Sequence, residues 1–253
     1  NKVIEIEGNK IGLLICEDSW NLSSLYNNDF NDLDFLISIN ASPFEKGKDE
    51  KRRRYFNKIA SKYNFNFIYV NTVGGQDEIV FDGSSFIVDK KGKIINICTS
   101  FSEEIFNLFS IEGNFSDKPS FNFSKNIIND ESALYNAIKI GTYDYISKSN
   151  LSGVILGLSG GIDSALTLAI ANDIFKKEEI EAILLPSMYT SDLSIQLAEQ
   201  QCKNLNINYS LISIEDINET VNKTLEKRFN GLQRDVTEEN IQARARGLIL
   251  MSI

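Results

Sequence analysis

Short apolar runs alternate with segments of helical periodicity in the second half of the chain. Each of three runs is followed by a segment whose apolar positions recur every three or four residues. The runs are 154–158, 181–185 and 209–214, and the helical segments are 163–175, 191–204 and 216–229. Repeating units of this length predict a doubly wound parallel sheet of the α/β class. In such a sheet, functional groups gather at the carboxyl ends of the strands.

The first half also mixes apolar runs with a helical segment, but without the regular repeat. Six runs predict strands: 11–15, 35–39, 65–70, 85–88, 94–97 and 105–111. The charged segment from Lys46 to Tyr63 predicts a helix, because Tyr55, Ile59 and Tyr63 recur every four residues. A hairpin turn is expected at Lys90–Lys93. These elements predict a layered arrangement of strands and helices.

The stretch between the halves, from Asn114 to Asn129, lacks either periodicity. A helix is expected to follow it, from Glu131 to Ser147. We therefore predict a domain at 1–115, a linker at 116–130 and a second domain at 131–253. The chain begins close to a strand and ends inside a predicted helix, so we expect it to be a piece of a longer polypeptide.

The composition of the chain limits the partners that it can bind and the catalytic groups that it can use. The 253 residues carry a net charge of −9, which argues against a nucleic-acid surface, and no apolar run has membrane length or the pattern of a signal peptide. Three widely spaced cysteines are typical of a reduced, cytoplasmic protein. The chain has no histidine, which excludes histidine-dependent triads and imidazole metal ligands. Any general base must be a carboxylate, a lysine or a tyrosine.

A glycine turn follows the first strand of the second half. The run ends at Ser159-Gly160-Gly161, and helical periodicity starts at Asp163-Ser164. Backbone N–H groups and a helix N-terminus at such a turn suit a phosphate. The turn has neither the lysine of a Walker loop nor the glycine spacing of a dinucleotide fold. The alternative is a plain turn capped by Ser159 and Asp163. Asp163 can either stabilise the helix dipole or hold Mg²⁺.

Three other places carry candidate chemistry. Cys16 follows an apolar strand and precedes Glu17-Asp18, so it is either a small core residue or a nucleophile at a strand end. The segment 186–191 follows the predicted strand 181–185 in the second half of the chain. Its hydroxyl groups can contact a nucleotide, or the segment can form a turn with a helix cap. Thr237 is the expected N-cap of the last helix, on which Asn240 and Arg244 share a face.

Several of these segments resemble known families. The Ser-Gly-Gly-x-Asp-Ser turn at 159–164 resembles the pyrophosphate loop of ATP pyrophosphatases. The segment around Cys16 resembles the nucleophile segment of the nitrilase superfamily, and so do the segments 40–48 and 70–83. The segment 237–247 resembles the Glu-Asn-x-Gln-Ala-Arg-x-Arg segment of NAD synthetases. Their order along one chain is similar to that of the glutamine-dependent NAD synthetases.

The resemblance implies a fold and a set of site residues. The fold is the C-terminal part of a nitrilase-like αββα sandwich followed by a parallel-sheet domain like the adenine nucleotide α-hydrolases. Cys16 would attack the glutamine amide, Ser42 and Lys48 would hold glutamine, and Asp163 would hold Mg²⁺. Asn240 and Arg244 would bind deamido-NAD, with Arg246 as an alternative phosphate partner. The implied ATP-binding residues are Gly157, Leu158, Ser159, Gly160, Gly161, Ile162, Asp163 and Ser164.

The implied reaction is the ATP-dependent amidation of deamido-NAD to NAD. Ammonia comes from glutamine, an adenylated intermediate forms, and AMP and pyrophosphate are released. We expect small-molecule substrates, no nucleic-acid or membrane partner, and a homo-oligomer. The family's Glu and Lys upstream of the cysteine, and its second acid for Mg²⁺, have no match in this chain. We therefore expect nucleotide binding rather than catalysis from these 253 residues alone.

Two alternatives stay open. The chain can belong to another glutamine-dependent ATP pyrophosphatase, similar to GMP synthetase or asparagine synthetase. It can also be a non-catalytic nucleotide-binding fragment.

Overall fold

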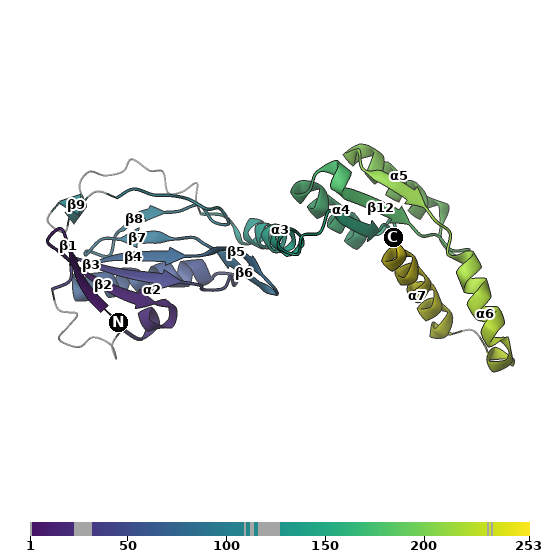
Figure 1. Ribbon diagram of the computed structural model, residues 1–253, viewed down its shortest axis with the longest axis horizontal. Helices are drawn as coiled ribbons and strands as arrows, with labels where there is room; N and C mark the ends of the chain where they lie inside the picture. Colours follow the sequence, from purple (N-terminus) through teal and green to yellow (C-terminus); the bar gives the residue numbers. More distant parts are fainter. Residues whose placement is uncertain are drawn as a thin grey trace. The chain divides into compact units, whose positions relative to one another are not determined.

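The computed structural model describes residues 2–22, 32–108, 110–111, 114–115, 127–231, 233 and 235–253. The chain divides into two compact units, Asn1–Tyr145 and Ile146–Ile253, both drawn in Figure 1. Most of the predicted linker, 116–130, lies outside the described residues, and the predicted domain ranges stay a prediction.

The first unit is built on a six-stranded sheet in the order β1-β2-β3-β4-β7-β8. Its strands are β1 (Lys2–Ile6), β2 (Asn9–Ile15), β3 (Phe35–Asn40), β4 (Asn66–Asn71), β7 (Phe86–Val88) and β8 (Ile94–Ile97). The central strands β2, β3 and β4 are parallel, with Leu14 beside Ser38 and Ser38 beside Tyr69. Their carboxyl ends therefore meet at one edge of the sheet. The remaining pairs are antiparallel, and β7 and β8 form the hairpin predicted at Lys90–Lys93.

Helix α2 (Lys48–Tyr63) lies along one face of this sheet (Figure 1). Phe56 is fully buried and stacks on Phe67 of β4, with ring centroids 4.3 Å apart. The residues of the predicted stripe, Tyr55, Ile59 and Tyr63, pack against the core but are only partly buried. The buried face is centred on Phe56 instead, because β4 presents an aromatic surface of Phe67 and Tyr69 to the helix.

The rest of the first unit comprises the 3-10 turn η1, two strand pairs and most of helix α3. The elements are η1 (Cys16–Asn21), the hairpin β5 (Val73–Gln76) and β6 (Ile79–Asp82), the pair β9 (Ser110–Ile111) and β10 (Asn114–Phe115), and α3 (Asp130–Lys148). Hairpin β5–β6 was not predicted. The strand predicted at 105–111 is largely wrong, since among the described residues of this range only 110–111 are paired and Ile105 is 92% exposed. Helix α3 contacts the hairpin, where the Gly75 N–H donates to Asp144 Oδ2 at 2.7 Å.

The second unit contains three parallel strands in the order β11-β12-β13. Its elements are β11 (Val154–Gly157), α4 (Ile162–Ile174), η4 (Lys177–Glu179), β12 (Ile180–Leu184), α5 (Asp192–Leu205), β13 (Asn208–Leu211), α6 (Glu215–Phe229) and α7 (Val236–Ser252). Alternate residues of β12 face different helices. Ala182 and Leu184 pack in a cluster with α4 and α5, whereas Ile183 packs in another with Ala245 of α7. Helices thus cover both faces, and the predicted doubly wound arrangement is confirmed.

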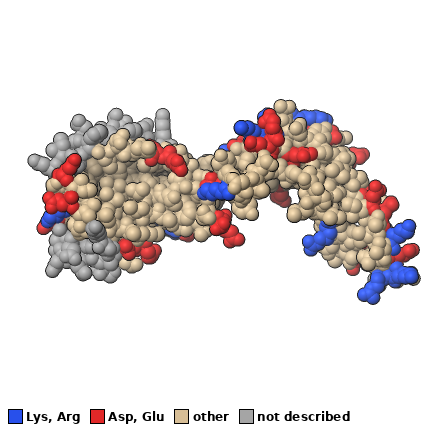
Figure 2. Space-filling view, viewed as in Figure 1, with Lys and Arg blue, Asp and Glu red and all other residues tan. Residues whose placement is uncertain are grey.

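Helix ends in the second unit follow local capping chemistry. Helix α7 is capped by Asp235, whose side chain accepts the Thr237 N–H at 2.8 Å, while Glu238 accepts the Asp235 N–H at 2.8 Å. The predicted cap at Thr237 is therefore wrong, because this reciprocal capping box starts the helix earlier. Figure 2 shows basic side chains at the carboxyl end of α6, where Lys227 and Arg228 complement the helix dipole. Among the described helices, none combines the length and apolarity that crossing a membrane requires.

The core of the first unit gives a stability prediction. Phe56→Ala should lower the free energy of unfolding of this unit by about 3–5 kcal/mol, because it leaves a cavity among aromatic rings. Ile105→Ala, at an exposed position, should change it by less than about 0.5 kcal/mol. Urea unfolding of both variants measures the difference, and equal losses would contradict the assigned core.

Candidate functional site

Cys16 lies where β2 gives way to η1. Its φ of 46° is in the left-handed region, which a residue with a side chain adopts only at a sharp turn. Two hydrogen bonds hold this turn. The Ser19 hydroxyl donates to the Cys16 carbonyl at 2.7 Å, and the Ile15 N–H donates to Asp18 Oδ2 at 3.3 Å. The turn places the thiol at the carboxyl edge of the parallel strands.

The other two cysteines are unsuited to nucleophilic chemistry. Burial, and to a lesser degree the Glu104 carboxylate, raise the pKa of Cys98 to about 11. Cys202 is fully buried in the core of the second unit, and burial also raises its pKa. A thiol that stays protonated is a poor nucleophile. Of the three cysteines, Cys16 is the one that directly follows a parallel strand at the carboxyl edge of the sheet.

Ser42 lies at the same edge of the sheet as Cys16. Burial raises the pKa of the Tyr69 phenol, nearby Ser42 and Arg52 partly lower it, and Cys16 and Asp82 raise it again. These four groups therefore lie near the Tyr69 phenol, and Cys16 and Ser42 are both among them. Ser42 itself is buried, with 5% of its surface exposed.

Lys48 is the first residue of α2 and is half-buried. It follows Gly47, which adopts the left-handed conformation and turns the chain into the helix. Lys48 therefore starts the helix that follows the loop carrying Ser42.

The glycine turn of the second unit is held from within by serine side chains. The hydroxyl of Ser164 accepts the Ser159 N–H at 3.3 Å and donates to the Gly161 carbonyl at 3.0 Å. Gly160 has a φ of 80°, and a Cβ at this position would lie 2.2 Å from the Ser194 carbonyl oxygen of α5. Glycine is required there both for conformation and for space. The turn leads directly into the N-terminus of α4, as a phosphate site needs.

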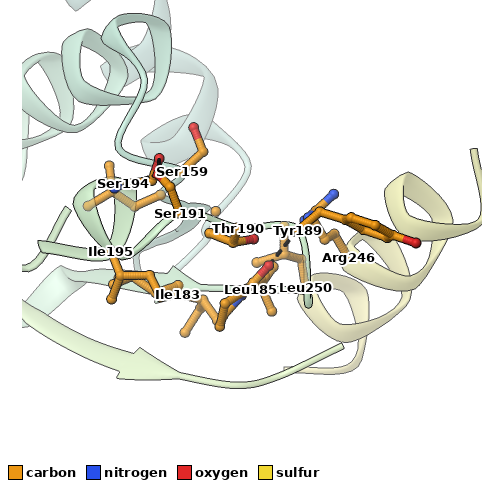
Figure 3. Close-up of a pocket in the computed structure, with 14 residues that line it drawn as sticks. Ser159, Ile183, Leu185, Tyr189, Thr190, Ser191, Ser194, Ile195, Arg246 and Leu250 are labelled. Carbon is orange, nitrogen blue, oxygen red and sulfur yellow. Dashed lines mark hydrogen bonds between the residues drawn. The ribbon is translucent and has the colours of Figure 1, made fainter. Parts of the chain in front are cut away.

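A cavity of about 630 Å³ opens beside this turn. Figure 3 shows Ser159 and Ser194 on one side of it and Tyr189 and Arg246 on the other. The Arg246 Nε–H donates to the Leu185 carbonyl oxygen at 3.2 Å, and this bond holds the guanidinium group at the edge of the cavity. The cavity is thus lined by the first turn of α5, by hydroxyl groups that include Ser159 of the glycine turn, and by a cation, whereas residues 160–164 are not part of its lining. Groups of these kinds can bind a nucleotide.

The segment that follows β12 forms the turn with a helix cap and also borders the cavity. The Ser187 N–H donates to Thr190 Oγ1 at 2.9 Å, and Ser191 caps α5 by accepting the Ser194 N–H. This is the turn with a helix cap. Tyr189, Thr190 and Ser191 also line the cavity. The parallel order of β11 and β12 explains why this segment and the glycine turn meet there.

Asn240 and Arg244 do not line that cavity. They lie in a separate, mainly apolar groove of about 430 Å³ beside Ile217 and Val221 of α6. Arg246 is two positions further along α7, on nearly the opposite side of the helix, and so reaches the cavity. The structure therefore separates the residues expected to bind deamido-NAD from the glycine turn.

Asp163 is exposed in the first turn of α4. The described residues contain no group of three Cys, Asp or Glu side chains arranged to hold a metal ion. One carboxylate fits Mg²⁺ only when phosphate oxygens of a bound nucleotide supply further ligands. Asp163 also stabilises the positive end of the helix dipole.

Comparison with known proteins agrees with these two units. Residues 1–107 match the carbon-nitrogen hydrolase family, and residues 134–253 match the NAD synthase family. The glutamine-dependent NAD(+) synthetase of Acinetobacter baylyi is 38% identical over 252 residues, which cover 99% of this chain and 46% of the relative. The Thermotoga maritima synthetase is 36% identical over 287 residues, covering 99% and 49%. The chain is therefore similar, over nearly its whole length, to the glutamine-dependent NAD(+) synthetases.

A solved structure supports the same conclusion. The glutamine-dependent NAD+ synthetase from Acinetobacter baumannii, solved in complex with adenosine diphosphate, superposes with a TM-score of 0.93 at 36% identity. It aligns with 99% of this chain, which covers 47% of that protein. The synthetase from Cytophaga hutchinsonii, at 20% identity and a TM-score of 0.79, shares the fold. The chain spans about half the length of the curated relatives it matches.

Sequence reasoning missed the polar residues that are buried in the first unit near the edge that carries Cys16. Arg52 pairs with Asp82, and Asn71 contacts the backbone of Ser42. Arg52 lies in a run of charged residues that is typical of a solvated helix face. Asp82 and Asn71 fall within the segment 70–83 that resembles the nitrilases. That resemblance was the only signal available for them.

The raised pKa of Cys98 predicts slow alkylation. At pH 9 only about 1% of this thiol should be ionised, so its labelling rate should still rise about tenfold per pH unit between about pH 8 and 10. Mass spectrometry of iodoacetamide-treated native chain measures the rate. The folded state holds this proton more tightly than the unfolded state, so stability should fall as the pH rises from about 9 to 11. A native rate that levels off near pH 9, as in urea, would contradict the assignment.

Proposed function

We propose that the protein containing this chain makes NAD from deamido-NAD, ATP and the amide nitrogen of glutamine. One observation carries the proposal: a nucleophile at a strand edge and a phosphate-type cavity lie in two separate units of one chain. The first unit matches the carbon-nitrogen hydrolases and the second matches the NAD synthases. Each unit supports one half of a coupled reaction.

In the first half-reaction, the Cys16 thiolate attacks the amide carbon of the glutamine side chain. The C–N bond breaks and ammonia leaves, so that a thioester joins Cys16 to the glutamyl group. Water then attacks the thioester, which frees glutamate and returns the thiol. Ser42 and Lys48 hold the glutamine, Lys48 by attraction to its α-carboxylate.

In the second half-reaction, the carboxylate of deamido-NAD attacks the α-phosphorus of ATP, and pyrophosphate leaves. Ammonia then attacks the resulting acyl adenylate and displaces AMP to give the amide. The residues from Gly157 to Ser164 cradle the leaving phosphates through backbone N–H groups and the dipole of α4. Arg246, at the cavity rim, offers a cation to the nucleotide.

Two further roles complete the proposal. Bound Mg²⁺ would neutralise phosphate charge, and Asp163 would supply its one protein carboxylate. Asn240 and Arg244 would contact deamido-NAD from their separate groove. The three cysteines are free thiols, which fits a cytoplasmic protein, and we expect a homo-oligomer.

Removing the nucleophile should separate the two half-reactions. In the intact protein, Cys16→Ala should lower glutamine-driven NAD formation more than about 10³-fold and leave ammonia-driven formation within about twofold. Cys98→Ala is the matched control and should retain both activities. Steady-state assays with each nitrogen donor measure the effect. Loss of both activities in Cys16→Ala would contradict the two-site assignment.

The glycine turn gives a binding prediction. Gly160→Ala should weaken the affinity of the chain for ATP with Mg²⁺ at least about tenfold, because the new Cβ displaces the turn from Ser194. Gly247→Ala is the control, since a Cβ at that helical position meets no atom within 4 Å. Isothermal titration measures both affinities. Unchanged binding by Gly160→Ala would place the nucleotide elsewhere.

A further inference from the structure

A fully buried ion pair lies beneath the edge of the sheet that carries Cys16. Arg52 of α2 is 0% exposed and Asp82 of β6 is 2% exposed. Arg52 Nη1 donates to both carboxylate oxygens, at 3.0 and 3.1 Å, and Nη2 donates to Oδ1 at 3.0 Å. Such a pair carries a large desolvation cost, so its main effect is to fix geometry rather than to add stability. The groups that it fixes are those that make its other hydrogen bonds.

Asn71 joins this ion pair to the Ser42 loop, the residues 41–47 that connect β3 to α2. Asn71 Nδ2 donates to Asp82 Oδ1 at 3.3 Å and to the Ser42 carbonyl at 3.2 Å. Asn71 Oδ1 accepts the Ser42 N–H at 2.9 Å. Only one orientation of the carboxamide satisfies all three bonds, because Asp82 and the carbonyl need a donor and the N–H needs an acceptor. Asp82 therefore sets the orientation in which Asn71 holds Ser42.

The same ion pair also fixes both sides of the Ser42 loop. Arg52 Nη2 donates to the carbonyl of Pro43 at 3.3 Å. Arg52 lies one helical turn after Lys48, so holding Arg52 also holds the first turn of α2. The buried Arg52–Asp82 ion pair thus holds both Ser42, in the loop, and Lys48, in the first turn of α2.

We propose that Asn71, oriented by the Arg52–Asp82 ion pair, is a positioning residue for glutamine. It contacts the backbone of Ser42 and so sets where the Ser42 side chain lies at the Cys16 edge. The inference rests on the proposed roles of Cys16, Ser42 and Lys48. Small displacements of such holding groups reduce binding and attack geometry strongly. The role of Asn71 is therefore specific to the glutamine half-reaction.

Asn71→Ala in the intact protein tests this role. The KM for glutamine should rise at least about tenfold, while ammonia-driven NAD formation stays within about twofold. Asn66→Ala is a matched control, because Asn66 is a buried asparagine at the other end of the same strand. Its Nδ2 donates to the Asp34 carbonyl at 3.0 Å and its Oδ1 accepts the Lys90 N–H at 3.2 Å. This control should lower the melting temperature and leave the glutamine KM within about twofold.

The isosteric Asn71→Asp variant covers the case in which the alanine variant fails to fold. Its ionised carboxylate has no donor for the Ser42 carbonyl and faces the charge of Asp82. Relative to the wild type, its glutamine KM should fall as the pH is lowered from about 8 to 6, since protonation restores a donor.

The outcomes distinguish the positioning role from the proposed function. Equal KM changes in the Asn71 and Asn66 variants, or equal loss of ammonia-driven synthesis, would overturn the positioning role. So would an Asn71→Asp variant whose glutamine KM matches that of the wild type at every pH. Failure of the wild-type protein to use glutamine at all would overturn the proposed function instead.

Discussion

Parallel strand pairing is the constraint on which both candidate sites depend. Strands β2, β3 and β4 run in one direction in the first unit, as do β11, β12 and β13 in the second. Every segment that leaves such strands at their carboxyl ends emerges at the same edge. Cys16 and Ser42 lie at the same edge for this reason, and Ser159 of the glycine turn lines one cavity with the segment after β12.

The two units hold their site segments by different means. In the second unit, the glycine turn is fixed by close backbone approach, with Gly160 packed against the carbonyl of Ser194. In the first unit, the Ser42 loop is fixed by the buried ion pair through Asn71. Where a glycine packs closely against a backbone, the backbone cannot move to admit a larger side chain. A network of polar side chains loses its geometry when one of its hydrogen-bond partners is removed. Substitutions should therefore act by steric clash at the glycine turn of the second unit and by loss of hydrogen bonds at the Ser42 loop of the first.

The parts of the structure that follow from local pattern could be predicted from the sequence. Hydrophobic periodicity located the strands and helices of the second unit, and strand ends located Cys16 and the glycine turn. Pairings between distant residues could not be predicted. Arg52 and Asp82 are 30 residues apart, and nothing near either indicates its partner. The sequence left Arg244 and Arg246 as alternatives, because the cavity that Arg246 lines forms only after α7 has packed on the sheet.

The central claim is that amide nitrogen freed at Cys16 becomes the amide nitrogen of NAD. The most direct measurement supplies the intact protein with ATP, deamido-NAD and glutamine labelled with ¹⁵N at the side-chain amide. Mass spectrometry of the product then reads the origin of the nitrogen. The account predicts NAD that carries one ¹⁵N, together with AMP, pyrophosphate and unlabelled glutamate in matching amounts. NAD without the label, or label transfer that persists in Cys16→Ala, would contradict it.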